Sequence, residues 1–440
     1  MATTHFVDKE TVIEPEWANE VDALVHDVFE AATTKAEART KLELKSAATK
    51  DVGTASDEIP QNSDLGTASK KDAGAPIGVT PLKKPDSSKP CIKKTGAQTL
   101  SVRAGTSVRL DDGTIISFDS DTAITMPSLT AGTDYSVWVN PDGTASAHEE
   151  TDYSSASVIS APTSGAKCIG GFHYGLVDPD ETVSGGSFAE SGTGWIWSQD
   201  DVDDIRGINK YSIWDLHWRK STNMQGQRGF AYSPRKRAWG AIYFCSTDPD
   251  ANGLSRAGTD IASGTNPCKI PKAVGGDGTK VYDSSSQWGG FNWFAAQEVA
   301  SAYDSRLPWE HEAHAFFLGV TEEQSIGGSS STYPTTERNA GYTSVIGIEQ
   351  ASGHHYAWGM DSAIRPDKGD TGAWHEVTGG RGSIYTFGTD GEALVRVRLG
   401  GNRTRGSHSG SACALWHIWP WNVHWSAGLR AAGDHLERAA

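Results

Sequence analysis

Residues 415–427 gather a dense group of aromatic and imidazole side chains. The stretch reads LWHIWPWNVHWSA and contains four tryptophans and two histidines in 13 residues. Pro420 interrupts regular structure, so we expect Trp419, Trp421 and Trp425 in a displayed loop and Trp416 in the core. Indoles are strongly enriched at binding hot spots, where truncating one costs about 2 kcal/mol or more. The stretch therefore predicts a recognition surface rather than a catalytic centre.

A second group of candidate residues is His311-Glu312-Ala313-His314. Zinc proteases need two histidines four residues apart on a helix, whereas these two are three residues apart. We therefore expect a solvated helix face here. The HH pair at 354–355 and the GSHSG motif at 406–410 contain isolated polar groups. Their spacing from other polar residues indicates no partner for catalysis or ligand binding. We expect no catalytic residue.

One segment imitates the start of a calcium-binding loop. Its four residues are Asp248, Asp250, Asn252 and Gly253. The twelfth position of such a loop would be Thr259 instead of the bidentate glutamate that calcium requires. We expect no cofactor and no metal ligand set, and a weak structural cation at this segment stays open as an alternative.

The composition restricts the partners. The chain has 39 basic and 55 acidic residues, a net charge of −16, which argues against nucleic-acid binding. No apolar run of about 20 residues is present, so we expect no membrane insertion. The N-terminus MATTHFVDKE lacks the pattern of a signal peptide, which predicts synthesis in a cytoplasm. The cysteines follow no CxxC spacing, so we expect buried thiols at Cys91, Cys168, Cys245, Cys268 and Cys413.

The periodicity of apolar residues predicts an α+β fold in several parts. Trp17, Val21, Leu24, Val28 and Ala31 follow a heptad pattern that favours self-association of an N-terminal helix. A near-repeat, DVGTAS and DLGTAS, suits an extended fibre segment. Alternating strands with turn signals at 111–113 and 140–143 predict a small β-sandwich. Helices are expected over 292–303 and from Pro308, with Trp309, Ala313 and Phe316 or Phe317 facing inward.

The predicted organisation has five parts. They are a fibre anchor and trimerisation segment (1–75), a linker (76–96), a β-sandwich (97–175), a second linker (176–205) and a C-terminal C-type lectin-like domain (206–440).

The last part is identified by resemblance. Four motifs resemble, in order, those of C-type lectin folds of the formylglycine-generating-enzyme branch: RLP with two glutamates (306–312), GHHYAW (353–358), RLGG (398–401) and GLR (428–430). Those enzymes use a pair of reactive cysteines near the C-terminus. Here only Cys413 lies in that region. The resemblance therefore implies the fold without the oxidase activity.

A closer resemblance covers residues from about 100 to 436 and points to the tropism determinants, a family of phage receptor-binding proteins. The matching segments are DTAITMPSLTAGTDY (121–135), GGFHY (170–174), YSIWDLHW (211–218), VGGDG (274–278), RLPWEHEAHAFFLG (306–319), TGGRGSIY (378–385), SGS with ALW (409–416) and DHL (434–436). The first 90 residues instead resemble the N-terminal parts of phage tail fibres, through FVDKETVI and the AATKDVGTA-type repeat.

The family resemblance implies a homotrimer whose lectin-like domains each present a shallow face to a host cell-surface receptor, either protein or glycan. In that family a diversity-generating retroelement varies the face. Aligned on the family's C-terminus, the variable positions here are Asn402, Thr404, Gly406, His408, Leu415, His417, Ile418, Asn422, His424, Ser426 and Ala427. The predicted receptor-binding face comprises these positions together with Trp419, Trp421 and Trp425.

Departures from the family leave open whether this face is diversified or constant. Arg403 stands where the family has tryptophan, and Ala412 replaces an arginine. The resemblance implies a receptor-binding protein at the tip of a tail fibre of the virion, made in the host cytoplasm and joined to other tail proteins through its N-terminus. The alternative is a tailspike enzyme that degrades host polysaccharide. Such enzymes place paired carboxylates about 5–9 Å apart, usually on a repetitive β-helix, and the chain lacks these repeats.

Overall fold

The computed structural model divides the chain into two units, Met1–Gly74 and Ala75–Ala440. In the first unit it describes only two short parallel strands, β1 (Val52–Gly53) and β2 (Ile59–Pro60). In the second unit it describes residues 81–437 except 155–158, 184–187, 189–193, 222, 284–288, 329–334, 366–372, 377–381 and 387–392. The predicted heptad helix therefore lies outside the described residues.

A β-sandwich opens the second unit. Its central sheet has the order β10-β9-β11-β12, and two three-stranded sheets, β3-β6-β7 and β4-β5-β8, accompany it. The strands are β3 (Leu82–Lys83), β4 (Ile92–Gly96), β5 (Thr99–Val102), β6 (Thr106–Arg109), β7 (Ile115–Phe118), β8 (Thr122–Ala123), β9 (Thr133–Val139), β10 (Ala145–Glu149), β11 (Lys167–Tyr174) and β12 (Trp214–Asp215).

Both predicted hairpins of the sandwich are present. β6 and β7 pair antiparallel around Gly113, and β9 and β10 pair antiparallel around Gly143. Both glycines have positive φ, 90° and 86°, a conformation that these tight turns require and that glycine adopts without steric cost. Val108 and Val137 are fully buried, as their alternation predicts.

Both predicted linkers include residues that form strands or a helix. Residues 82–96 contain β3 and β4, because Leu82 and Ile92 are apolar residues that the sandwich core buries despite the surrounding lysines and prolines. The stretch 176–205 ends in helix α4 (Gln199–Ile205), where Ser198 and Asp201 form a capping box. β12, placed beyond the predicted boundary at 206, pairs with β11 of the sandwich.

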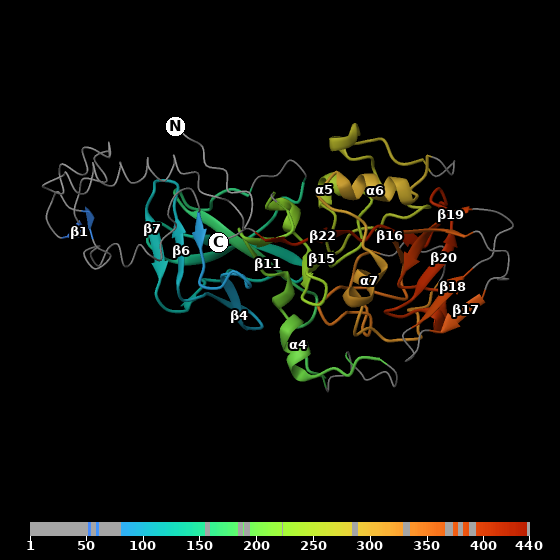
Figure 1. Ribbon diagram of the computed structural model, residues 1–440, viewed down its shortest axis with the longest axis horizontal. Helices are drawn as coiled ribbons and strands as arrows, with labels where there is room; N and C mark the ends of the chain where they lie inside the picture. Colours follow the sequence, from blue (N-terminus) through green and yellow to red (C-terminus); the bar gives the residue numbers. More distant parts are fainter. Residues whose placement is uncertain are drawn as a thin grey trace, which may run out of the picture. The chain divides into compact units, whose positions relative to one another are not determined.

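The C-terminal part contains a six-stranded mixed sheet of order β17-β18-β20-β19-β16-β21. Its strands are β16 (Tyr356–Arg365), β17 (Ala373–Glu376), β18 (Ser383–Thr386), β19 (Ala393–Leu399), β20 (Ala414–Ile418) and β21 (Ala427–Gly428). Figure 1 shows β16, β20, β18 and β17 side by side, with helix α7 (Glu310–Phe316) next to β16. The smaller strands are β13 (Trp218–Arg219), β14 (Phe230–Ser233), β15 (Ala238–Ala241), β22 (Ala432–Asp434) and β23 (Leu436–Glu437).

The two predicted helices of this part are present. Helix α6 (Trp293–Ser301) begins at Asn292, whose side chain caps it by accepting a hydrogen bond from the Ala295 backbone N–H. In α7, Ala313 and Phe316 face the core as predicted, but Trp309 is 39% exposed. A short α5 (Pro249–Asn252) precedes them, and the 3₁₀ turns are η3 (Lys210–Ser212), η4 (Gln225–Gln227), η5 (Lys272–Val274) and η6 (Gly406–His408).

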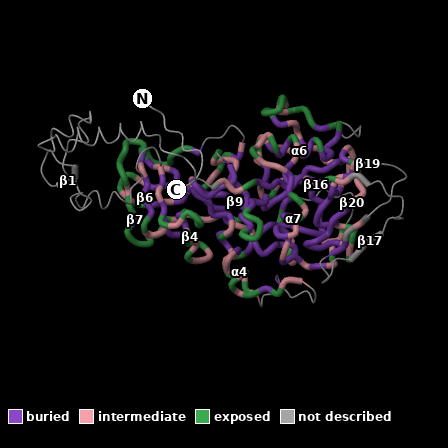
Figure 2. Tube along the Cα trace, viewed as in Figure 1, coloured by how far each residue is buried: buried purple, intermediate pink, exposed green. Residues whose placement is uncertain are grey.

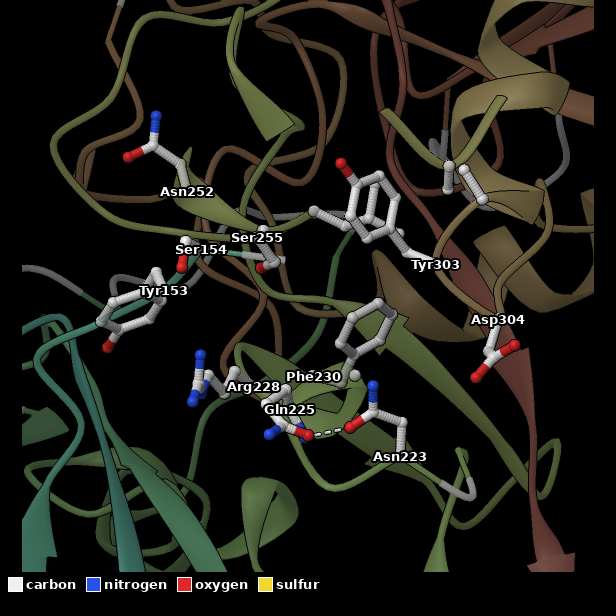
Figure 3. Close-up of a pocket in the computed structure, with 15 residues that line it drawn as sticks. Tyr153, Ser154, Asn223, Gln225, Arg228, Phe230, Asn252, Ser255, Tyr303 and Asp304 are labelled. Atoms are coloured by element: carbon white, nitrogen blue, oxygen red, sulfur yellow. Dashed lines mark hydrogen bonds between the residues drawn. The ribbon is translucent and has the colours of Figure 1, made fainter. Parts of the chain in front are cut away.

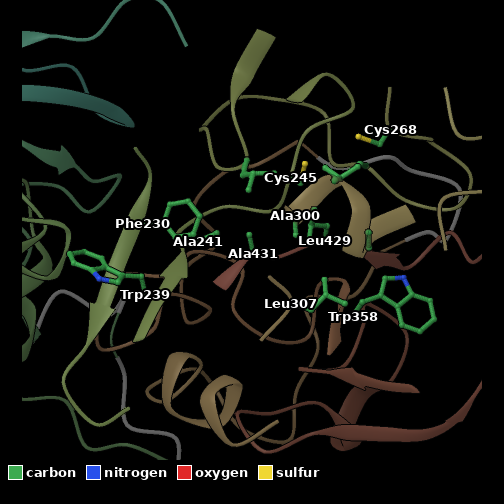
Figure 4. Close-up of a cluster of buried hydrophobic side chains, with 14 of the residues drawn as sticks. Phe230, Trp239, Ala241, Cys245, Cys268, Ala300, Leu307, Trp358, Leu429 and Ala431 are labelled. Carbon is green, nitrogen blue, oxygen red and sulfur yellow. The ribbon is translucent and has the colours of Figure 1, made fainter. Parts of the chain in front are cut away.

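Buried residues run through the sandwich strand β9 and through the first residues of β16 and β20 in the larger sheet (Figure 2). One buried cluster joins Phe230 and Trp239 of the β14–β15 hairpin to Leu307, Trp358 and Leu429 (Figure 4). The five cysteines are free thiols and all are buried, as the sequence predicts. Among the described residues, no helix combines the length and apolar character needed to cross a membrane.

Candidate functional site

Strand β20 carries part of the predicted recognition stretch and lies inside the six-stranded sheet. It pairs parallel with β18 on one side and antiparallel with β19 on the other. The turn after β19 needs its glycines: Gly401 has φ 80°, and a Cβ there would lie 2.4 Å from the Ser409 hydroxyl. This tight turn directs the chain into the loop that contains η6, next to the β17–β18 hairpin.

Aromatic and imidazole rings from three segments meet along this edge of the sheet. Trp374 of β17 stacks on His408 of η6, with ring centroids 4.2 Å apart and planes 5° apart. Tyr385 of β18 makes edge contacts with Trp374 at 5.0 Å and with His417 of β20 at 4.8 Å. Arg405 lies over the Trp374 ring at 5.6 Å. We call these five residues the aromatic face.

Trp419 and Trp421 form a second ring pair just beyond β20. Their centroids are 6.0 Å apart with planes 27° apart, and Trp419 is 44% exposed, as the sequence predicts. Pro420 between them is buried, and its carbonyl accepts the backbone N–H of Trp293 at 3.0 Å. The proline therefore anchors the loop to the start of α6, while the indole of Trp419 stands outward. Trp416, expected in the core, is half-buried, and its indole N–H donates to Glu310 at 3.4 Å.

The next residues along the chain, 422–425, pack against the interior of the domain. Asn422 accepts a hydrogen bond from the buried Arg398 at 2.7 Å, and Arg398 itself lies over the Trp358 ring at 4.1 Å. His424 packs against Trp425, with centroids 5.5 Å apart. Asn422, His424 and Trp425 are half-buried, so each presents one side to solvent.

The structure separates the fourteen predicted face residues into two sets. Ten are exposed or partly exposed: Thr404, Gly406, His408, His417, Ile418, Trp419, Trp421, Asn422, His424 and Trp425. The other four are buried: Asn402, Leu415, Ser426 and Ala427. The Asn402 amide donates to the Ser426 hydroxyl at 2.8 Å, so these two residues tie the two loops together beneath the surface. Inward-facing and outward-facing side chains do not strictly alternate along β20, because the register of the β19–β20 pairing shifts between Arg396 and Arg398.

The histidines of the site are poor bases. Burial lowers the pKa of His417 and of His424 to about 4, with Arg398 and Arg405 adding to the effect. Burial, then Arg405, also lowers the pKa of His408. These imidazoles are therefore neutral at neutral pH, and the face offers flat, uncharged rings beside the single exposed cation of Arg405.

Arg430 supports this region from the interior. It is fully buried, and its guanidinium donates to the carbonyls of Ala241, Ile242, Glu349 and Gln350 at 2.7–3.1 Å. These contacts join the end of β15 and the loop at 349–350 to the segment between β21 and β22. Arg430 thus stabilises the scaffold by donating hydrogen bonds to backbone carbonyls of distant segments.

Sequence reasoning did not find Trp374, Tyr385 or Arg405. Trp374 and Tyr385 lie on a hairpin separated from β20 by about 30 residues or more along the chain, and the parallel β18–β20 pairing that brings them together is non-local. The available signals were the position of Arg405 between two predicted face residues, Thr404 and Gly406, and the family-like segment TGGRGSIY, which ends at Tyr385.

The other candidate groups are occupied by protein contacts. Asp248 caps α5 and forms an ion pair with Lys269 at 2.6 Å, and Asp250 accepts a hydrogen bond from the Tyr303 hydroxyl. Among the described residues, no three acidic, histidine or cysteine side chains are grouped as metal ligands. The expectation of a solvated face at 311–314 is wrong for Glu312, which is buried because it forms a bidentate pair with Arg306.

A separate cavity of about 230 Å³ lies between the end of the sandwich and the lectin-like part. Figure 3 shows Tyr153 from the sandwich side, with Phe230, Tyr303 and Asp304 from the other side. Asp304 accepts a hydrogen bond from Ser221 and the Tyr303 hydroxyl donates to Asp250. None of the residues of the aromatic face lines this cavity.

Comparisons with known proteins agree with this architecture. Residues 90–215 match the family described as Mtd second domain. The tail fiber receptor-binding protein of Bordetella phage BPP-1 is 32% identical over 369 residues, which span 80% of this chain and 84% of that protein. Among solved structures, the Major Tropism Determinant M1 variant superposes with a TM-score of 0.64 at 30% identity, covering 82% of this chain and 87% of that one. The U1 variant gives a TM-score of 0.63 at 28% identity, covering 88% and 91%.

The fold and the ring-lined edge of the sheet thus define a C-type-lectin-like binding protein. At this level of identity and coverage, the chain belongs to the family of phage tail-fibre receptor-binding proteins that includes the major tropism determinants.

Proposed function

We propose that this protein attaches a phage particle to a host surface receptor through the aromatic face together with Trp419 and Trp421. The observation that carries the proposal is the meeting of Trp374 and Tyr385 of the β17–β18 hairpin with His417 of β20, a strand that is distant along the chain. Aromatic rings give large contact area at low entropic cost, and Arg405 adds one charge that can orient a partner.

The ten exposed and partly exposed positions form the contact surface in this proposal, and the four buried ones support it. Asn402 and Ser426 stabilise the loops through their mutual hydrogen bond, while Leu415 and Ala427 fill the core. If a diversity-generating retroelement varies the face, a reverse-transcriptase gene and a near-copy of the 3′ end of this gene should lie next to it. Absence of both would leave a constant face.

The receptor class can be determined on intact cells of the strain that the phage infects. Labelled protein should bind these cells, and excess unlabelled protein should compete. Protease treatment of the cells removes binding if the receptor is a protein, whereas mild periodate oxidation removes it if the receptor is a glycan. Binding that survives in a variant lacking both Trp419 and Trp421 would contradict the proposed face.

We further propose that the working form is a homotrimer at the tip of a tail fibre, with the N-terminal segment contacting other tail proteins. The heptad from Trp17 to Ala31 and the family relationship support this assembly. Sedimentation equilibrium should give three times 47.0 kDa. A monomer that persists at micromolar concentration would exclude it.

A polysaccharide-degrading activity has less support. Glu310 and Asp361 are neighbouring carboxylates near Trp416, but Asp361 accepts the backbone N–H of Glu310 at 2.6 Å, a structural role at the start of α7. Incubation with host capsule should release no reducing ends. Their release, and its loss in Glu310→Gln, would establish the enzyme instead.

A further inference from the structure

A strongly basic groove lies where the sandwich meets the lectin-like part, on a chain whose net charge is −16. Its volume is about 790 Å³, within the usual range for ligand sites. Six basic side chains line it, and no acidic residue does: Lys89, Lys93, Lys94, Arg103, Lys210 and Arg237. Such a concentration of one sign of charge in a concave site attracts counter-ions of the opposite sign.

Carboxylates form ion pairs with three of the six cations. Lys89, Lys93 and Lys210 form ion pairs with Asp86, Asp121 and Asp204, which lie outside the lining. Arg103 donates to the carbonyl oxygen of Pro90 at 2.9 Å, and Lys94 donates to that of Arg206 at 2.8 Å.

Backbone carbonyls orient these two cations, and their charges are offset in part by Asp203 and Asp204 near Lys94 and by Asp121 near Arg103. Lys94 stands at the C-terminal end of α4, where its ammonium also satisfies the last carbonyls of that helix. Half-buried and held in place, Lys94 and Arg103 can meet an anion with little further loss of side-chain entropy.

Aromatic rings complete the groove. The partly exposed Tyr211 lines it together with the cations, as do Trp218 and Tyr232, which are each 9% exposed. Trp218 makes an edge contact with Tyr232 at 4.9 Å, which fixes both rings. Rings beside cations suit a ligand that carries both an apolar face and a negative charge, which is the chemistry of an acidic sugar.

We propose that this groove binds a polyanionic glycan of the host surface, through carboxylate or phosphate groups on its sugars. Only the source of the glycan rests on the proposed function, because the binding chemistry follows from the groove itself. The groove and the aromatic face share no residue. The groove would hold the particle at a charged cell surface through a contact that salt weakens, while the aromatic face selects the receptor.

The test uses the full-length protein and three hexasaccharides of equal length. Hexagalacturonate carries carboxylates, phosphorylated maltohexaose carries phosphates and maltohexaose is neutral. Titration calorimetry at 0.01 M salt should detect binding of one or both anionic probes and none of the neutral one. Raising the salt to 0.15 M shortens the Debye length from about 30 Å to about 8 Å and should weaken binding at least about tenfold.

The chain offers a matched pair of variants. Lys89 and Lys280 are both exposed lysines paired with an aspartate three residues away, with side-chain exposures of 60% and 64%, and only Lys89 lines the groove. Lys89→Glu should weaken binding of the anionic probe about tenfold, whereas Lys280→Glu, with the same change in net charge, should change it less than about twofold.

Three results would overturn the proposal. They are no binding of either anionic probe, equal loss in the two variants, and equally tight binding of a single-stranded DNA oligomer, which would make the groove a general polyanion site. A Trp419→Ala variant separates this proposal from the proposed function. This variant should lose cell attachment if the proposed function holds. It should still bind the anionic probe as tightly as the wild-type protein does, because Trp419 lies outside the groove.

Discussion

Replacing Trp419 by alanine tests the recognition surface most directly, because this indole is more exposed than any other described tryptophan. A little over half of the residue is buried, about 110 Å² of a typical 200 Å² for tryptophan. At about 25 cal/mol per Å² this corresponds to at most about 3 kcal/mol of folding free energy. The exposed part is available to a partner, and truncation of a hot-spot tryptophan costs about 2 kcal/mol of binding, or roughly 30-fold in Kd.

Trp309 provides the matched control, since its exposed fraction of 39% is close to the 44% of Trp419. Trp309→Ala removes the same group at a similar cost in folding and lies outside the aromatic face. Both variants should therefore unfold at similar denaturant concentrations. Only Trp419→Ala should weaken attachment of the purified protein to cells of the infected strain, measured as a binding isotherm on folded protein.

Two outcomes would refute the reasoning. Equal attachment by Trp419→Ala and wild type would mean that the exposed indole does not contact the receptor. Equal loss of attachment in both variants would mean that the loss arises from general destabilisation of the domain.

Three further predictions follow from the contacts. Trp374→Ala removes the ring that stacks on His408 and should weaken cell attachment about tenfold, whereas Trp374→Phe should retain most of it; equal effects would exclude stacking as the cause. Arg430→Met leaves four buried carbonyls without their donor and should lower unfolding stability by about 4 kcal/mol in urea, and a loss below about 1 kcal/mol would contradict its structural role. The pKa values in the folded state are near 4 for His417 and His424 and near 3 for His355, below the unfolded value of about 6.5. The unfolded chain therefore takes up protons first as the pH drops. Stability should fall between about pH 6.5 and pH 4. Burial raises the pKa of Glu349 to about 7, so its contribution to stability grows as the pH drops and offsets the loss from one of these histidines. Unfolding curves that coincide at pH 7 and pH 5 would refute the predicted net loss of stability.

Local features of the sequence predicted the elements well where a short-range physical rule applies. Asn292 marks the start of α6 because its side chain satisfies a free backbone N–H, and Gly113 and Gly143 mark hairpins because they adopt positive φ. The prediction of a linker is wrong for residues 82–96, because the lysines and prolines of this stretch hide the apolar pattern of two short strands. Leu82 and Ile92 are few in number, yet the sandwich core buries both completely.

By itself, the sequence determined the family through ordered motifs, and it predicted that residues 415–427 are a recognition stretch because of their indoles and imidazoles. Only the tertiary structure decided which of those side chains reach solvent. Asn402 and Ser426 turn inward to bond each other, while Trp374 and Tyr385 join the surface from a distant hairpin. The physical reason is that pairing between β18 and β20 is a long-range event with a shifted neighbouring register, and neither side-chain type nor local periodicity encodes it.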